Sequence, residues 1–160
     1  MPSAIVNECS ELIKKENLKL FFVESATAGR ICYEFSLTEQ AGEFLKGSLV
    51  CYNADIKQDI LRVQKTLIDT FTPESPEVTA ALTDGAKTMF LADIHVSVTG
   101  LTTPGGSETA DKPVGTMFIH GKFKDKDFID RSVFQGGPEE VVMQTVDRVA
   151  FLIIQTIKSV

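Results

Sequence analysis

The stretch "LKLFFVESATAGR", residues 18–30, joins a run of apolar residues to a segment of small residues and hydroxyls. The apolar run at 18–23 is short, which is typical of a strand buried in a sheet. Residues 27–37 read as a helix, so the chain changes from strand to helix around Ser25. Ligands of open α/β sheets bind beyond the carboxyl ends of the strands, which makes this junction a candidate site.

Strands and helices alternate along the rest of the chain. Apolar runs predict further strands at 47–52, 93–100, 116–123 and 128–134, and helical periodicity predicts helices at 3–16, 53–63, 75–92 and 139–158. The charged turn "KDKD" predicts a hairpin between the last two strands. The alternation favours an α/β fold with helices on both faces of the sheet, and the hairpin makes that sheet mixed.

Composition indicates one ordinary globular domain over residues 1–160, with 43% hydrophobic and 24% charged residues. The net charge of −6 argues against nucleic acid or an anionic membrane as a partner. We expect a cytoplasmic protein, because the sequence shows no signal peptide and no apolar run of membrane-spanning length. Cys9, Cys32 and Cys51 form no metal-binding pattern and are expected to be reduced thiols; no metal or cofactor is expected.

The sequence around Ser25 has two interpretations. Backbone N–H groups at a helix start are unpaired and can bind a phosphate or an oxyanion, and small neighbours let a substrate approach. Alternatively, Ser25 or Thr27 only caps the following helix, which such residues commonly do. A nucleophilic serine needs a base, and both histidines, His95 and His120, lie inside predicted strands.

Lys57 is the candidate base. Lysine can take the proton of a serine when burial or neighbouring charges lower its pKa, and Lys57 is expected near a helix start, where the dipole disfavours a cation. Tyr52, at the preceding strand end, is placed to hydrogen-bond to Lys57 or Ser25. The alternative is that Lys57 is an ordinary solvated lysine beside Asp55 and Asp59.

The Gly- and Thr-rich segment "LTTPGGSETADKPVG", residues 101–115, follows the strand at 93–100. Its backbone donors and hydroxyls are suited to phosphate or ribose, although many surface loops have this composition.

Several motifs taken in series resemble the C-terminal domain of the CinA family, whose stand-alone members include nicotinamide-mononucleotide deamidases. The matching motifs are "ESATAG" (24–29), "KGSLVCYNADIK" (46–57), "SPEVTAALTDGAK" (75–87), "VTGLTTPGGSETADKPVGT" (98–116) and "FQGG" (134–137). Their order and spacing cover nearly the whole chain.

The resemblance implies a three-layer α/β/α sandwich with a mixed, mostly parallel sheet that assembles into homo-oligomers. It implies hydrolysis of the carboxamide of nicotinamide mononucleotide to nicotinate mononucleotide and ammonia. Ser25 would be the nucleophile, Lys57 its base and Tyr52 a helper in proton transfer or positioning. The implied substrate-binding residues are Glu24, Thr27, Ala28, Gly29, Arg30, Ser48, Thr99, Gly100, Pro104, Gly105 and Gly106.

The chain departs from the family pattern in three places. Ala28 and Thr103 stand where glycines are usual, and Pro138 follows "FQGG" where the family has an aspartate and an arginine. These departures leave two alternatives to the deamidase open: a catalytically silent nucleotide-binding or regulatory relative, and an amidase for a different small amide.

Overall fold

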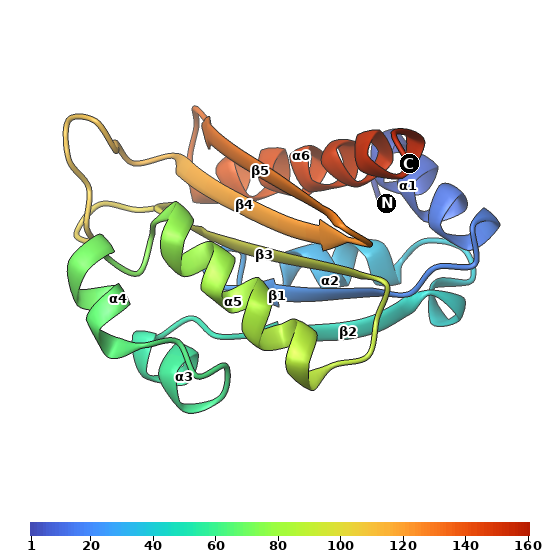
Figure 1. Ribbon diagram of the computed structural model, residues 1–160. Coiled ribbons are helices and arrows are strands. Elements are labelled where there is room, and N and C mark those ends of the chain that lie inside the picture. The colour runs from blue at the N-terminus through green and yellow to red at the C-terminus, as the bar shows by residue number, and fades with distance from the viewer.

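The computed structural model describes all 160 residues as one sheet of five strands between two layers of helices (Figure 1). The sheet consists of β1 (Leu20–Glu24), β2 (Leu45–Val50), β3 (Ile94–Gly100), β4 (Thr116–Phe123) and β5 (Lys126–Val133). The strand order is β2-β1-β3-β4-β5. β1 pairs in parallel with β2 and β3, and β4 pairs antiparallel with β3 and β5. The predicted mixed sheet and its late hairpin are confirmed.

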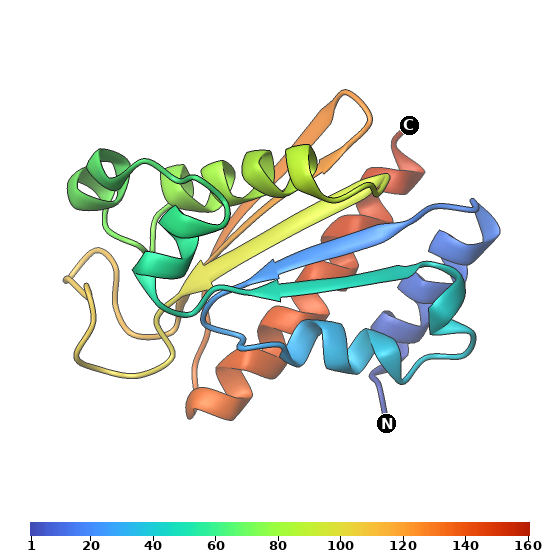
Figure 2. The same ribbon diagram turned by 90° about the horizontal axis from the view of Figure 1, so that it is seen from below.

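The helices divide between the two faces of the sheet (Figures 1 and 2). One face carries α1 (Ala4–Lys15), α2 (Arg30–Ser36) and α6 (Pro138–Lys158), and the other carries α3 (Ala54–Asp59), α4 (Lys65–Phe71) and α5 (Pro76–Met89). A short 3-10 turn, Ala41–Glu43, precedes β2.

The core has two parts because strand side chains alternate between the faces. Phe22 joins the cluster beneath α1, α2 and α6, whereas Phe21 and Val23 join the cluster beneath α5. All five residues of β1 are buried, as expected for a central strand covered on both sides.

Three of the helix starts have the predicted capping residues. The side chains of Ser3, Asn53 and Ser75 accept hydrogen bonds from the first turns of α1, α3 and α5, and Pro76 stands at the first position of α5. These caps fix the positions at which the three helices begin.

Several predictions were wrong in their bounds. The helix expected over 75–92 ends at Met89, and the strand expected over 47–52 spans Leu45–Val50. The helix expected over 27–37 begins at Arg30, because Ala28 and Gly29 have left-handed φ values of 49° and 94°. The helix expected over 53–63 ends at Asp59, and a separate helix, α4, follows that the sequence pattern did not predict.

Both chain termini lie at the end of the molecule away from the 101–115 loop (Figure 1). The three cysteines are free, and Cys9 and Cys51 are buried. No helix combines the length and apolarity required to cross a membrane.

Candidate active site

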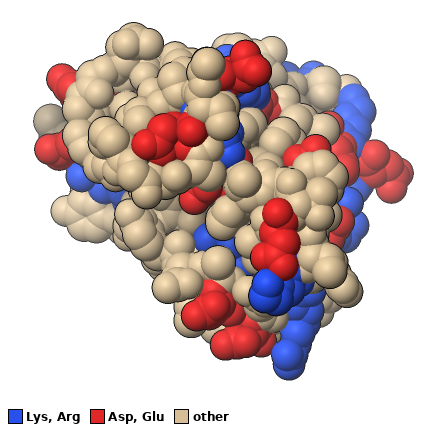
Figure 3. All heavy atoms as spheres, turned by 90° about the vertical axis from the view of Figure 1, so that its left-hand side faces the viewer, with Lys and Arg blue, Asp and Glu red and all other residues tan.

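The carboxyl ends of β1, β2 and β3 bring three loops together at one edge of the sheet (Figure 2). These loops enclose a cavity of about 170 Å³ that contains the Ser25 side chain. The residues lining it are Ser25, Ala26, Tyr52, Glu74, Gly100, Leu101, Thr102, Thr103, Pro104, Gly105 and Gly106. Figure 3 shows this side of the molecule, where separate acidic and basic groups lie on a mostly uncharged surface.

Ser25 and Lys57 meet beneath the cavity. The Nζ atom of Lys57 lies 2.9 Å from Oγ of Ser25, within hydrogen-bonding distance. Lys57 is 1% exposed and Ser25 is 7% exposed. The alternative of a solvated lysine beside Asp55 and Asp59 is therefore wrong.

The remaining contacts of Lys57 come from the two residues that follow β2. Its Nζ atom donates to the backbone carbonyls of Cys51, at 2.6 Å, and Tyr52, at 3.4 Å. Burial lowers the pKa of Lys57 from its ordinary value, while the electrostatic effects of Cys51 and Glu74 act in the opposite direction. The expected dipole effect does not apply, because Lys57 lies in the middle of a helix of only six residues.

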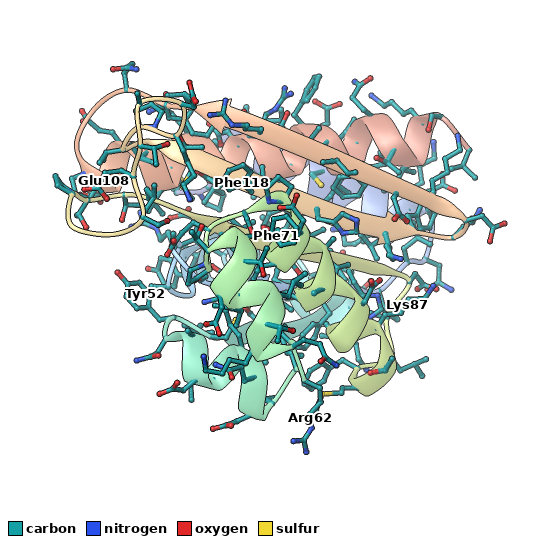
Figure 4. The ribbon with its side chains drawn as sticks, turned by 60° about the vertical axis from the view of Figure 1, so that its left-hand side comes forward. Tyr52, Arg62, Phe71, Lys87, Glu108 and Phe118 are labelled. Carbon is teal, nitrogen blue, oxygen red and sulfur yellow. The ribbon has the colours of Figure 1, made fainter.

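Tyr52 lies at the rim of the cavity. Its side chain is among the exposed ones, at 64%, and it projects from the edge of the molecule in Figure 4. The contact between Tyr52 and Lys57 is made by the backbone carbonyl, and the phenol oxygen bonds to neither Lys57 nor Ser25.

Glu24 holds the turn that carries Ser25. Its carboxylate is fully buried and accepts five hydrogen bonds. The donors are the hydroxyls of Thr27 and Ser48 and the backbone N–H groups of Gly29, Ile31 and Cys32. A carboxylate at a helix N-terminus satisfies the unpaired donors of the first turn and interacts favourably with the helix dipole. Glu24 therefore binds most of the backbone N–H groups at the start of α2 that were expected to bind an anion.

Two backbone donors beside Ser25 remain free. The N–H groups of Ala26 and Thr27 donate no hydrogen bond within the chain, whereas those of Ser25 and Ala28 bond to carbonyl groups. Ala26 also lines the cavity. A donor directly after a nucleophile is suitably placed to stabilise a negative charge that develops on a substrate oxygen.

The 101–115 loop closes the cavity, and its glycine donors are also occupied. The carboxylate of Glu108 accepts from the N–H groups of Gly105 and Gly106, at 2.7 and 2.8 Å, and these bonds lower the pKa of Glu108. Glu108 projects from this loop in Figure 4. A phosphate that used the same two N–H groups would have to displace it.

Of the other predicted binding residues, Gly100 lines the cavity, whereas Thr99 and Arg30 lie around it without lining it. Thr99 is fully buried, and its hydroxyl lies 2.8 Å from that of Thr79 on α5. Arg30 pairs with Glu34 and, more distantly, with Glu139. Gly100 ends β3, and a Cβ atom at this position would lie 2.7 Å from the backbone oxygen of Thr116, so a larger residue would require the backbone to shift.

Glu74 is a cavity residue that the sequence reasoning missed. It precedes the capping serine of α5, and its Oε2 atom accepts a hydrogen bond of 2.5 Å from the Ser107 hydroxyl. The Nζ atom of Lys112 donates to the Glu74 carbonyl and to the hydroxyls of Thr72 and Ser107, at 2.8 to 2.9 Å. Only one signal for this role is present in the sequence, an acidic residue in the segment before α5. Such a residue by itself is interpreted as a solvated loop residue.

The other main cavities contain no pair of a hydroxyl and an amine like that of Ser25 and Lys57. The largest, about 750 Å³, lies between the segment that follows α3 and the outer side of α5, and it contains no hydroxyl–amine pair. No group of three or more histidine, cysteine, aspartate or glutamate side chains is arranged to hold a metal ion.

The family model of the CinA C-terminal domain matches residues 3–157 of the chain. The chain belongs to the CinA C-terminal domain family. A CinA-like protein of Leptospira biflexa is 35% identical over 156 residues, which cover 92% of this chain and 36% of the relative. A putative competence-damage inducible protein of Bacillus cereus is 36% identical over 118 residues, covering 72% of this chain and 28% of the relative. The chain thus spans about a third of the length of these curated relatives.

Solved structures of the CinA superfamily have the same fold. A protein from Klebsiella pneumoniae superposes with a TM-score of 0.91 over 98% of this chain and 97% of its own, at 20% identity. The protein CihA from Agrobacterium tumefaciens, described as competence/damage inducible, superposes with a TM-score of 0.89 over 97% of both chains, at 24% identity. At such identities the likeness establishes the architecture.

Proposed function

We propose that this CinA-family domain is an amidohydrolase in which Ser25 is the nucleophile and Lys57 is the base. The observation that carries the proposal is the buried pair of Ser25 Oγ and Lys57 Nζ, 2.9 Å apart at the floor of a cavity. A hydroxyl within hydrogen-bonding distance of a base of lowered pKa is the arrangement that nucleophilic catalysis requires.

Lys57 Nζ donates to Ser25 Oγ as an ammonium, and the same contacts also accommodate a neutral amine that accepts the Ser25 proton. Two of its partners, the carbonyls of Cys51 and Tyr52, only accept hydrogen bonds. A neutral amine has two N–H groups for these carbonyls, and its lone pair is then directed to the third partner, the Ser25 hydroxyl. The carbonyls thus orient the lone pair, and burial lowers the pKa of the ammonium form.

Hydrolysis then proceeds in two balanced stages. Ser25 Oγ attacks the carboxamide carbon while its proton passes to Lys57, and the free N–H of Ala26 is a candidate donor to the resulting oxyanion. The Lys57 ammonium returns the proton to the departing nitrogen, which leaves as ammonia. A water molecule activated by Lys57 then hydrolyses the ester on Ser25 and releases the carboxylic acid.

We propose nicotinamide mononucleotide as the substrate, on the basis of the motifs that resemble the deamidases of the family. The cavity is smaller than the roughly 300–1,000 Å³ of typical ligand pockets. Its volume of about 170 Å³ accommodates a carboxamide and an aromatic ring, so the ribose and phosphate would extend past the rim formed by Tyr52 and Pro104.

A second candidate is an amidase for a different small amide. The observation that favours it is the Glu108 carboxylate on the N–H groups of Gly105 and Gly106, which were the expected phosphate donors.

A substrate panel separates the two candidates. The purified protein is incubated with nicotinamide mononucleotide, its dephosphorylated nucleoside, free nicotinamide and glutamine, and ammonia and the acid product are quantified. The proposal predicts equal amounts of ammonia and nicotinate mononucleotide, with the mononucleotide hydrolysed fastest. Faster turnover of a phosphate-free amide would favour the second candidate.

We also propose that the chain forms homo-oligomers. β5 is an edge strand, and its outward-facing Ile129 and Val133 are 68% and 40% exposed. Exposed apolar residues on an unpaired edge favour association with another chain. Sedimentation of the purified protein tests this proposal, and a monomer at all concentrations would refute it.

A further inference from the structure

The cavity above Ser25 contains one charged lining residue, the carboxylate-bearing Glu74. The other ten lining residues are uncharged; two nearby lysines, Lys57 in contact with Ser25 and Lys112 in contact with Ser107, lie outside the lining. A small cavity with a single carboxylate favours a ligand group of positive charge, because the low-dielectric walls weaken the screening of that charge.

Glu74 is held in place by two donors of the 101–115 loop. Its carboxylate accepts the 2.5 Å hydrogen bond from Ser107, and its backbone carbonyl accepts from Lys112. Because both donors belong to the 101–115 loop, the loop and the start of α5 fix the carboxylate together. A carboxylate fixed in this way loses little conformational freedom when a ligand binds.

The position of Glu74 is unfavourable for a phosphate but favourable for a cationic ring. The reacting carboxamide must lie against Ser25, so the ring attached to it occupies the same small cavity as Glu74. In nicotinamide mononucleotide this ring is a pyridinium, which carries a positive charge. The phosphate, two linkages away, lies outside the cavity.

We infer that Glu74 is a specificity residue that selects substrates whose amide-bearing ring is cationic. This inference rests on the proposed function for the identity of the substrate. Glu74 does not exchange protons with the substrate; its charge interacts with the ring and so distinguishes a pyridinium from a neutral ring of the same shape. The field of the same carboxylate also reaches Lys57.

The test compares two ligands that differ in ring charge. Nicotinamide mononucleotide has a pyridinium ring, and its reduced form has a neutral dihydropyridine with the same carboxamide, ribose and phosphate. Binding of both is measured by calorimetry in the Ser25→Ala background, so that no turnover occurs. We expect the oxidised form to bind roughly five- to tenfold more tightly, the effect of one partly screened ion pair.

Matched variants assign that preference to Glu74. Glu74→Gln keeps an oxygen that accepts from Ser107 and removes the charge, so it should bring the two affinities to parity. Glu74→Asp keeps the charge and should keep a preference. Glu77→Gln removes an exposed charge in the first turn of α5 and should leave the preference unchanged. Thermal melting confirms that each variant is folded.

The outcomes separate this inference from the proposed function. A preference that survives Glu74→Gln, or equal binding of both forms in the Ser25→Ala protein, would overturn the role of Glu74 even if the wild type releases ammonia. A Glu74-dependent preference in a protein that does not hydrolyse the mononucleotide would support the role of Glu74 and refute the proposed reaction. Binding of neither form would overturn the inference.

Discussion

Lys57 Nζ and Ser25 Oγ lie 2.9 Å apart although 32 positions separate the two residues in the chain. The contact exists because β1 and β2 are parallel neighbours, so Ser25, directly after β1, and α3, which follows β2 and contains Lys57, lie at the same edge of the sheet. The carbonyls of Cys51 and Tyr52 hold the amine there. The proposed chemistry depends on this one contact.

Lys57→Arg tests the base. Arginine keeps the positive charge but stays protonated in proteins, so it cannot accept the proton of Ser25. We expect ammonia release to fall by about 10³-fold or more. Lys65→Arg, at an exposed lysine paired with Asp69, is the matched control and should retain full activity. Wild-type turnover by Lys57→Arg would exclude Lys57 as the base.

The pH dependence of kcat/KM reports the protonation of Lys57. The amine acts as a base only when neutral, so activity should rise with pH through the pKa of Lys57. Since burial lowers that pKa, the midpoint should fall below the ordinary value of about 10.4. A profile independent of pH between about 6 and 10 would contradict this assignment.

Glu74→Gln should shift that midpoint. The carboxylate of Glu74 favours the ammonium form of Lys57 and so raises its pKa. Removing the charge should lower the pKa further and move the rising limb of the profile to lower pH. Glu77→Gln serves as the control, and a limb displaced to higher pH in Glu74→Gln would show that the two groups do not interact as described.

Glu24→Gln should destabilise the fold. The carboxylate is buried and accepts five hydrogen bonds, and an amide presents an NH₂ group to some of the same donors. We expect the free energy of unfolding to fall by about 2–4 kcal/mol, measured by urea denaturation. Glu11→Gln, at an exposed position of α1, should have little effect. Equal stability of the two variants would mean that Glu24 does not support the turn.

Glu108→Ala tests where the phosphate binds. The variant frees the N–H groups of Gly105 and Gly106 and removes a negative charge. The preference for the mononucleotide over its nucleoside should therefore increase several-fold in calorimetric titrations. An unchanged preference would place the phosphate away from this loop.

The sequence predicted the convergence of Ser25, Tyr52 and Lys57 better than it predicted the bounds of the helices around them. Ser25 lies after one apolar run recognisable as a strand and Tyr52 at the end of another, so their convergence at one edge could be expected from general rules of α/β sheets. The helix bounds near Ser25 failed because Ala28 adopts a left-handed conformation that alanine rarely takes. Its residue type therefore gave no sign of a turn.

The roles of the acidic residues could not be read from the sequence. Glu24, Glu74 and Glu108 each bind donors fixed by tertiary structure: the first turn of α2, the Ser107 hydroxyl and the glycines of the 101–115 loop. Glutamate is usually exposed, and a single sequence does not distinguish a buried acceptor from a solvated one.

Ammonia release by Ser25→Ala, compared with the wild type on nicotinamide mononucleotide, tests the central claim most directly. The account predicts that the wild type releases ammonia and nicotinate mononucleotide in equal amounts. It predicts that the folded Ser25→Ala protein loses turnover by roughly 10³-fold or more while still binding the nucleotide. Turnover by Ser25→Ala at the wild-type rate would contradict it, because hydrolysis would then proceed without the hydroxyl that Lys57 contacts.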